Sequence, residues 1–239
     1  MDWMSVFENG LRTALGVTAA VYALTAVGIN LQFGYTGLAN YGQAGFLLVG
    51  AYGTAVAVDR WDLPLWVAFF VGVAAAIVLG LLLGIPTLRL RADYLAIVTI
   101  SAAEILRITT NSRAAQDVTG GPQGIKGFAG DFYDLNPLEG RFTLFGDVGY
   151  TARNLWVILV TWSIVAICSG ALFLLMRSPW GRVLRAIRED EDAVRSLGKN
   201  VFAYKMQSLV IGGVIGGVAG IMLVIDRQFV EARNFESSI

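Results

Sequence analysis

Long apolar runs, separated by short polar stretches, constrain this chain more than any other feature. Each run approaches the roughly 20 residues with which an α-helix crosses the hydrocarbon core of a membrane. Within that core the backbone must satisfy its own hydrogen bonds, which a helix does inside one segment. The runs that qualify are 11–29, 41–58, 65–85, 94–110, 155–176 and 206–225. They predict an all-α fold, a polytopic membrane helical bundle with about six spans in one domain, residues 1–239.

Composition supports this class and excludes others. Charged residues make up 15% of the chain, against about 25% in soluble domains, and the mean hydropathy is +0.62. The chain has no histidine, which excludes Ser-His-Asp and Cys-His catalysis and every histidine-containing metal site. The net charge is zero, and no basic patch with interleaved aromatic residues points to nucleic acid. We therefore expect no catalytic residue, no metal and no nucleic-acid partner, in a chain surrounded by membrane lipid.

A block of charge at 177–205 separates the last two apolar runs and sets the orientation of the chain. It holds seven of the 18 basic residues and is too polar to lie in hydrocarbon. Arg89 and Arg91 follow the third run, two spans earlier, so they share the side of this block. Basic loops next to spans are cytoplasmic, which places both there. The loop 111–153 and, by parity, the N-terminus then face outward.

The same block carries the signals of two short surface helices. Pro179 suits a first helical position. Arg182, Arg185 and Arg188 follow at three-residue spacing beside apolar residues, an amphipathic pattern that lies along a membrane surface. The acids 189–192 favour the start of a second helix because they complement its N-terminal dipole.

This second helix is expected over Ala193–Leu197, with Gly198 ending it and Asn200 capping the following span. Two interpretations of the block remain open on charge alone. It is either a rigid projection that sits in a groove of a soluble partner, or a solvated loop that only enforces topology.

Polar side chains and glycines are interleaved over 30–53, where a span is expected. The polar ones are Asn30, Gln32, Thr36, Asn40 and Gln43. Such groups are costly at membrane depth unless they face protein or a water-filled cavity. We therefore consider a broken or re-entrant helix near 30–45. Two interpretations stay open and are compatible with each other. The break builds a midplane site for a small molecule, as broken helices do in transporters, and its glycines allow close helix packing.

Two further features lie inside apolar runs. Glu104 and Arg107 are three residues apart, so they share a helix face and can pair. A structural ion pair near the outer interface is the preferred interpretation, and a substrate-path or proton-carrying Glu104 the alternative. In the last run, glycines recur every four residues from 212 to 220, which favours packing within the chain over a protomer interface.

Four stretches, 34–52, 86–107, 119–125 and 177–198, resemble a known family when taken in order. The chain is similar to the inner-membrane permease subunits of branched-chain amino acid ATP-binding-cassette (ABC) importers, specifically the second of their two paired permeases. Importers of urea or short amides are close relatives. The glycine-rich stretch 119–130 lacks the spacing of a phosphate-binding loop, so nucleotide binding is not expected here.

The resemblance makes 177–205 the loop that couples the permease to its ATPase. The family signature Glu-Ala-Ala-x-x-x-Gly begins here at Asp192 and Ala193 and ends at Gly198, with Asp in place of Glu and Val194 in place of the second Ala. The residues assigned to coupling on this basis are Arg182, Arg185, Arg188, Asp192, Ala193 and Gly198.

The resemblance also implies a non-enzymatic channel half in a bacterial inner membrane. Its partners would be a second permease, two cytoplasmic ATPase subunits that hold ATP and Mg²⁺, and a periplasmic or lipid-anchored binding protein. Asn40, Gln43, Thr99 and Glu104 would line the path. A secondary transporter driven by protons through Glu104 and a membrane scaffold are the competing classes. Because such permeases continue beyond a sixth span, we expect the chain to be C-terminally incomplete.

Overall fold

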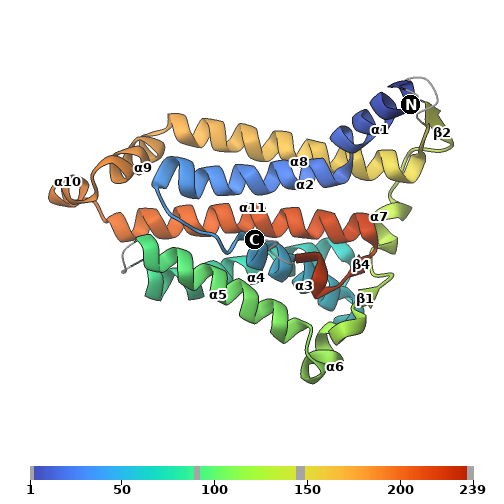
Figure 1. The fold of residues 1–239 in the computed structure, drawn as a ribbon, viewed down its shortest axis with the longest axis horizontal. Coiled ribbons are helices and arrows are strands. Elements are labelled where there is room, and N and C mark those ends of the chain that lie inside the picture. The colour runs from blue at the N-terminus through green and yellow to red at the C-terminus, as the bar shows by residue number, and fades with distance from the viewer. Residues whose placement is uncertain (1–2, 89–91, 144–148, 236–239) are drawn as a thin grey trace.

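A computed structural model describes residues 3–88, 92–143 and 149–235. Within them long helices run side by side in layers (Figure 1). Their bounds are α1 Trp3–Leu15, α2 Val17–Ile29, α3 Gln43–Trp61, α4 Leu65–Thr87, α5 Ala92–Thr110, α8 Ala152–Arg177 and α11 Val201–Arg227. The shorter helices are α6 Gln116–Thr119, α7 Gly130–Asp134, α9 Pro179–Glu189 and α10 Glu191–Ser196. The predicted all-α membrane bundle is confirmed.

Six of the long helices correspond to the six predicted runs. By length and composition, four helices of the described residues can cross a membrane: Val17–Tyr35, Leu65–Thr87, Ala152–Arg177 and Val201–Arg227. The other two predicted spans fold as the 19-residue helices α3 and α5. The span count is therefore approximate, while the positions of the long helices agree with the sequence prediction.

The predicted bounds of the first span were wrong at both ends. The chain turns at Gly16, whose extended backbone (φ −66°, ψ 166°) separates α1 from α2, so the span begins at Val17 rather than 11. At its other end a π-helical turn, Asn30–Tyr35, prolongs α2 by six residues. Hydropathy alone shows neither the turn at Gly16 nor the π-helical turn, because the apolar run continues through Gly16 and ends before Asn30.

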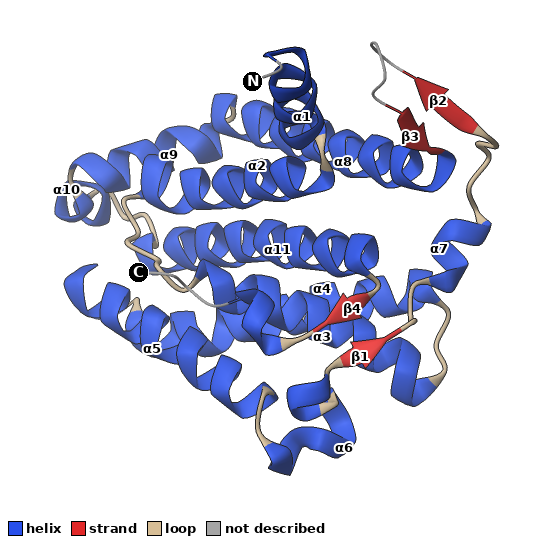
Figure 2. Ribbon diagram, turned by 45° about the vertical axis from the view of Figure 1, so that its right-hand side comes forward, coloured by secondary structure: helices blue, strands red, loops and turns tan. Residues whose placement is uncertain are grey.

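Helix α11 is the central element, with α2 and α8 on one side and α3, α4 and α5 on the other (Figures 1 and 2). Its glycines permit very close approach of other backbones. A Cβ on Gly50 of α3 would lie 2.6 Å from Gly217 Cα, and one on Gly28 of α2 would lie 2.6 Å from Gly212 O. The prediction that these glycines serve packing within the chain is confirmed.

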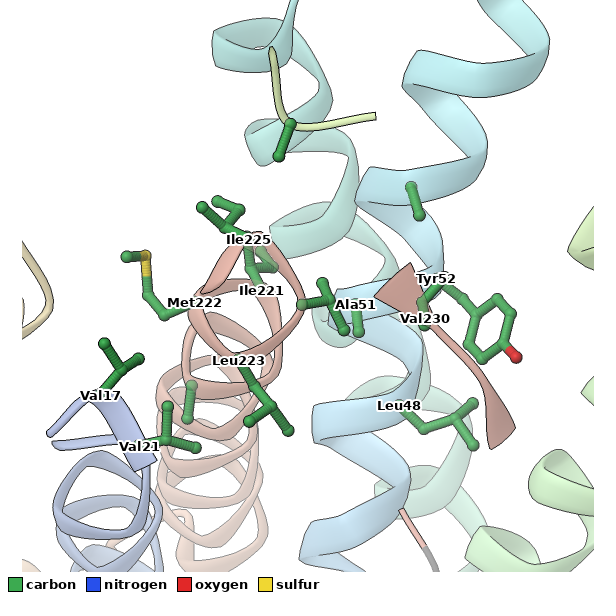
Figure 3. Close-up of a cluster of buried hydrophobic side chains, with 14 of the residues drawn as sticks. Val17, Val21, Leu48, Ala51, Tyr52, Ile221, Met222, Leu223, Ile225 and Val230 are labelled. Atoms are coloured by element: carbon green, nitrogen blue, oxygen red, sulfur yellow. The ribbon is translucent and has the colours of Figure 1, made fainter. Parts of the chain in front are cut away.

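The main apolar core joins α2, α3 and α11 near one end of the bundle. Figure 3 shows Met222 of α11 on the side of Val17 and Val21 of α2, and Leu223 of α11 on the side of Leu48 of α3. Within a membrane, lipid tails are as apolar as these side chains, so tight van der Waals contact rather than removal from water holds the helices together. Small residues at the helix crossings make that contact close.

The two ends of the bundle differ in character. Leu88 at the end of α4, the start of α5 and the helices α9 and α10 lie at one end (Figure 1). This agrees with the prediction that the block 177–205 and the basic turn near 89 share a side, although Arg89 and Arg91 themselves lie outside the described residues. Helix α1 lies at the opposite end, the relative placement that the parity of the spans predicted, and there Arg12 stacks on Tyr150 at 5.9 Å.

At the same end as α1, the described part of the loop 111–153 contains short helices and strands. Strand β1, Ile125–Lys126, pairs antiparallel with β4, Phe229–Val230, just after α11, and β2, Arg141–Thr143, pairs with β3, Gly149–Thr151 (Figure 2). The Tyr133 hydroxyl of α7 donates to Ile225 O at 2.9 Å. Burial raises the pKa of Tyr133 above its ordinary value, so the phenol stays a donor. The outer loop is thereby fastened to the end of α11.

Candidate functional site

The helix break that the sequence suggested is present. After the π-helical turn Asn30–Tyr35 the backbone is non-helical from Gly37 to Gly42, and α3 starts at Gln43. Gly37 has a φ of +72°, a left-handed conformation that glycine adopts without steric cost. Its neighbour Leu38 donates its backbone N–H to Gln32 O at 2.8 Å, which turns the chain back toward α11. The prediction of a broken helix near 30–45 is confirmed.

Three buried amides form a network at this break. Asn40 Nδ2 donates to Gln32 Oε1 at 2.8 Å and to Gln43 Oε1 at 3.4 Å. Gln32 Nε2 and Gln43 Nε2 each donate at 2.9 Å to α11 carbonyls, Leu209 O and Gly212 O. All three residues are buried: Gln32 is 1% exposed, Asn40 6% and Gln43 4%. The network therefore fixes the break against α11 and leaves these amides paired within the protein.

Buried hydroxyl groups extend the network on two sides. Thr36 Oγ1 and Ser208 Oγ are 2.6 Å apart. On α5, Thr99 Oγ1 accepts from the Tyr41 backbone N–H at 3.2 Å and donates to Ala96 O at 3.0 Å. The structure thus brings three of the four predicted path residues together, Asn40, Gln43 and Thr99.

The fourth predicted path residue, Glu104, belongs to a separate ion pair. Arg107 Nε donates to its Oε2 at 2.9 Å, and Arg107 Nη2 donates to Oε1 at 2.6 Å. The Glu104 side chain is 43% exposed. This bidentate geometry is the strong form of a carboxylate–guanidinium contact. The expected pairing between the two side chains is therefore present on α5.

At the opposite end of the bundle from α1, α9 and α10 follow the predicted capping pattern. Pro179 stands in the first turn of α9, and Asp190 caps α10 by accepting from Ala193 N at 3.0 Å. Gly198 takes a φ of +75° just after α10, and Asn200 caps α11 by accepting from Ala203 N at 3.1 Å. Helix α10 begins at Glu191 rather than at the predicted 193, because the cap lies within the acidic run.

Helix α9 is packed onto the bundle rather than solvated. Leu184 and Ile187 on its apolar face are buried with Leu31 at the end of α2. The remaining buried members of this cluster are Leu172, Met176, Val194 and Val201. A movement of α9 must therefore displace the ends of α2, α8 and α11, because all of them contribute to the same cluster.

The three arginines of α9 have different environments. Arg182 is exposed, and Arg185 Nη2 donates to Met176 O at 3.2 Å at the end of α8. Arg188 Nη1 donates to Gly34 O in the π-helical turn. The spacing of three residues predicted a shared face but gave no sign of these carbonyl partners.

The segment from Asp192 to Gly198 forms the exposed tip of this end. Asp192 has an 89% exposed side chain and pairs with Arg195 at 2.9 Å, while Ala193 and Gly198 are also exposed. Leu197 is 79% exposed. Beside the tip lies a polar cavity of about 380 Å³ whose lining includes Lys199. Such a surface can receive a partner protein.

Two residues of the site were missed in the sequence. Ser208 bonds Thr36, and its position four residues before Gly212 continues the small-residue repeat of α11, which was the available signal. Lys205, 16% exposed, is joined to Glu191 by an ion pair that links α11 to α10. Its only sequence signal was a lone lysine at the start of an apolar run.

Comparison with known proteins places this arrangement in a family. Residues 12–239 match the family described as "Branched-chain amino acid transport system / permease component". The high-affinity branched-chain amino acid transport system permease proteins LivM of Escherichia coli (strain K12) and Salmonella typhimurium are each 33% identical, over 98% of this chain and 56% of their own length. The chain thus spans little more than half the length of these relatives.

A relative whose name gives a different substrate also matches. The nucleoside ABC transporter permease protein NupC of Lactococcus lactis is 27% identical over 77% of this chain and 57% of its own length. The long apolar helices and these permease relatives make the chain a multi-pass protein of the bacterial inner membrane. The match over residues 12–239 shows that the chain belongs to the family of permease components of branched-chain amino acid transport systems, a non-catalytic membrane component of ABC transporters.

Proposed function

We propose that this chain supplies one permease half of an ABC importer that carries branched-chain or related amino acids into the cell. A second permease subunit completes the pathway, and two cytoplasmic ATPase subunits hold ATP and Mg²⁺. A periplasmic or lipid-anchored binding protein delivers the substrate at the outer end. Family membership supports this assignment in general terms, and the partner set and substrate are the proposed part.

The observation that carries the proposal is the form of the cytoplasmic end. An exposed tip, Asp192–Gly198, is mounted on a helix whose Leu184 and Ile187 are buried against the spans. A docking element needs both properties, because it must be reachable by a soluble subunit and must pass that subunit's movement on to the membrane helices. We assign Arg182, Arg185 and Arg188 to the same coupling element.

The proposed path follows the helix break. Asn40, Gln43 and Thr99 lie where α2 is interrupted beside α5 and α11, and broken helices are the usual place for a polar path in a transporter. We assign Glu104, farther along α5, to the outer part of the path. Since the amides are paired within the protein, a substrate passes them only when the break rearranges.

The test reconstitutes the complete transporter, with its cognate subunits, in proteoliposomes. We expect ATP-dependent uptake of leucine, isoleucine or valine in preference to a nucleoside, urea or a short amide. Preference for one of these other substrates would replace the proposed substrate while keeping the importer class. Uptake that needs no ATPase subunit would contradict the proposed function as a whole.

Two substitutions at the docking element sharpen this test. Arg185→Glu and Gly198→Glu should each reduce both ATPase association and uptake, because one reverses a charge and the other places a side chain at a φ of +75°. Asp117→Asn, an exposed change in the outer loop, is the control and should leave ATPase association unchanged.

A further inference from the structure

The contact between Arg188 and Gly34 joins the coupling element to the broken helix. Gly34 lies in the π-helical turn, one residue before its end at Tyr35. The last four carbonyls of a helix have no partner within the helix, and a cation near them is favoured by the helix dipole. Arg188 therefore acts on the end of α2 as a cap supplied by another helix.

The stem of the same arginine covers the residue where the chain leaves the helix. A Cβ built on Gly37 would lie 3.2 Å from Arg188 Cγ and 3.7 Å from Arg188 Cβ. Gly37 is the residue with a φ of +72° at this point. Arg188 thus contacts the broken segment twice, at the carbonyl of Gly34 and at the left-handed turn of Gly37.

Both sides of this contact are themselves fixed. On α9, the adjacent Ile187 is buried with Leu31 of the π-helical turn. On the broken segment, Asn40 lies three positions after Gly37, and its amide group donates hydrogen bonds to Gln32 and Gln43. A displacement of α9 by even a small distance therefore either breaks the Arg188 contact or pulls the segment that carries Asn40.

We propose that Arg188 is a positioning residue that ties the position of α9 to the conformation of residues 34–40. When α9 is in the position described here, the hydrogen bond from Arg188 to Gly34 O fixes the non-helical segment. Asn40 then stays hydrogen-bonded to Gln32 and Gln43. When a docked partner displaces α9, the cap is lost and the segment rearranges, which frees the amides. This inference rests on the proposed function, because it names the contact through which the coupling element acts.

The test uses the full-length permease assembled with its partner subunits in proteoliposomes. Arg188→Met keeps an unbranched side chain but removes the charge and every donor, whereas Arg188→Lys keeps a charge and a donor. Arg60→Gln, which removes an arginine in the last turn of α3, is the control. The measurements are amide hydrogen exchange over residues 35–42, ATPase association, and substrate imported per ATP hydrolysed.

Arg188→Met should raise exchange over residues 35–42 by about tenfold and lower import per ATP by a similar factor, because a charge-assisted hydrogen bond is lost. ATPase association should stay within about twofold of wild type, because the Arg188 guanidinium is bonded to Gly34 O and the exposed tip Asp192–Gly198 provides the docking surface. Arg188→Lys should restore most of the protection from exchange and most of the import per ATP. If Arg188→Met showed wild-type exchange and wild-type import per ATP, the inference would be overturned. Loss of ATPase association would also overturn it, because Arg188 would then be a docking residue.

A second measurement does not depend on the folding of Arg188→Met. In the wild-type transporter, amide hydrogen exchange over residues 35–42 should rise about tenfold once ATP-bound ATPase subunits displace α9 and break the contact between Arg188 and Gly34. Equal rates with and without ATP would overturn the inference.

Failure of the proposed function gives a different result. If wild-type permease neither binds ATPase subunits nor imports with ATP, the importer assignment fails. The exchange of residues 35–42 in Arg188→Met, measured on the permease alone, still decides whether Arg188 holds the broken segment.

Discussion

Thr36 and Ser208 share a hydrogen bond of 2.6 Å between their hydroxyl oxygens, although 172 positions separate them in the chain. Both hydroxyls also lie within hydrogen-bond distance of Leu31 O, at 3.0 and 3.3 Å. The end of α2 is thus joined to α11 through buried polar groups. Since the same end of α2 meets α9, this junction connects the centre of the bundle with the end that carries α9 and α10.

The amide network should contribute measurably to stability. Gln43→Leu removes the donor to Gly212 O and the acceptor of Asn40 while keeping a side chain of similar size. We expect a loss of about 1 kcal/mol, the scale found for hydrogen bonds between membrane helices. Thermal unfolding in nanodiscs measures this, with the exposed outer-loop change Gln123→Leu as control. Equal melting temperatures in both variants would show that the network has no stabilising role.

The glycine contacts around α11 should be intolerant of a single methyl group. In Gly50→Ala the new Cβ would lie 2.6 Å from Gly217 Cα, and a backbone atom cannot move aside cheaply. Overpacking of this kind typically costs about 1–3 kcal/mol. The matched control is Gly170→Ala on α8, where no atom lies within 4 Å of the added Cβ.

The control should even gain stability from the higher helix propensity of alanine, by up to about 1 kcal/mol. Opposite signs for the two variants in a reversible unfolding assay are therefore expected. A gain in Gly50→Ala would contradict the helix packing described here.

The cap of α10 should control the order of the docking tip. Asp190→Ala removes the acceptor of the Ala193 backbone N–H and should destabilise the helix start by about 1 kcal/mol. Faster hydrogen exchange over 191–197 and weaker ATPase association are the expected results. Asp190→Asn keeps the cap and tests charge separately; equal loss in both variants would assign the effect to charge instead.

The Glu104–Arg107 pair should behave as a coupled unit. Loss of either partner alone, in Glu104→Gln or Arg107→Gln, should lower the unfolding temperature, because the other charge then loses this ion pair within a largely apolar helix. The double variant should recover part of the loss, and a double-mutant cycle measures the coupling energy. If Glu104→Gln instead abolished a pH dependence of uptake, a proton-carrying role would be supported.

Local patterns in the sequence predicted α9, α10 and the start of α11 well. Pro179, Asp190 and Asn200 act within one turn of their own position, so their roles can be inferred from neighbouring residues. The helix break also had a local signal, since polar residues and glycines interrupt an apolar run. The predicted α10 start was two residues late only because four consecutive acids offer several capping positions.

Contacts between distant segments were not accessible in the same way. Nothing near Arg188 indicates that its partner is the carbonyl of Gly34, and nothing near Ile125 indicates pairing with Val230. A backbone carbonyl or a strand edge has no side-chain signature, so only the three-dimensional arrangement shows it. The choice between a packing role and a path role for the glycine-rich stretch was likewise undecidable without knowing where Gln32 and Gln43 point.

The bonds from Gln32 and Gln43 to α11 also have a consequence for synthesis in the cell. Their acceptors, Leu209 O and Gly212 O, come 177 and 169 residues later in the chain. At typical translation rates those residues emerge about 10–35 s after the amides have entered the membrane. During this interval the first spans hold polar groups without their final partners. The two amides therefore reach their α11 acceptors only after α11 has been inserted, so this junction closes late in synthesis.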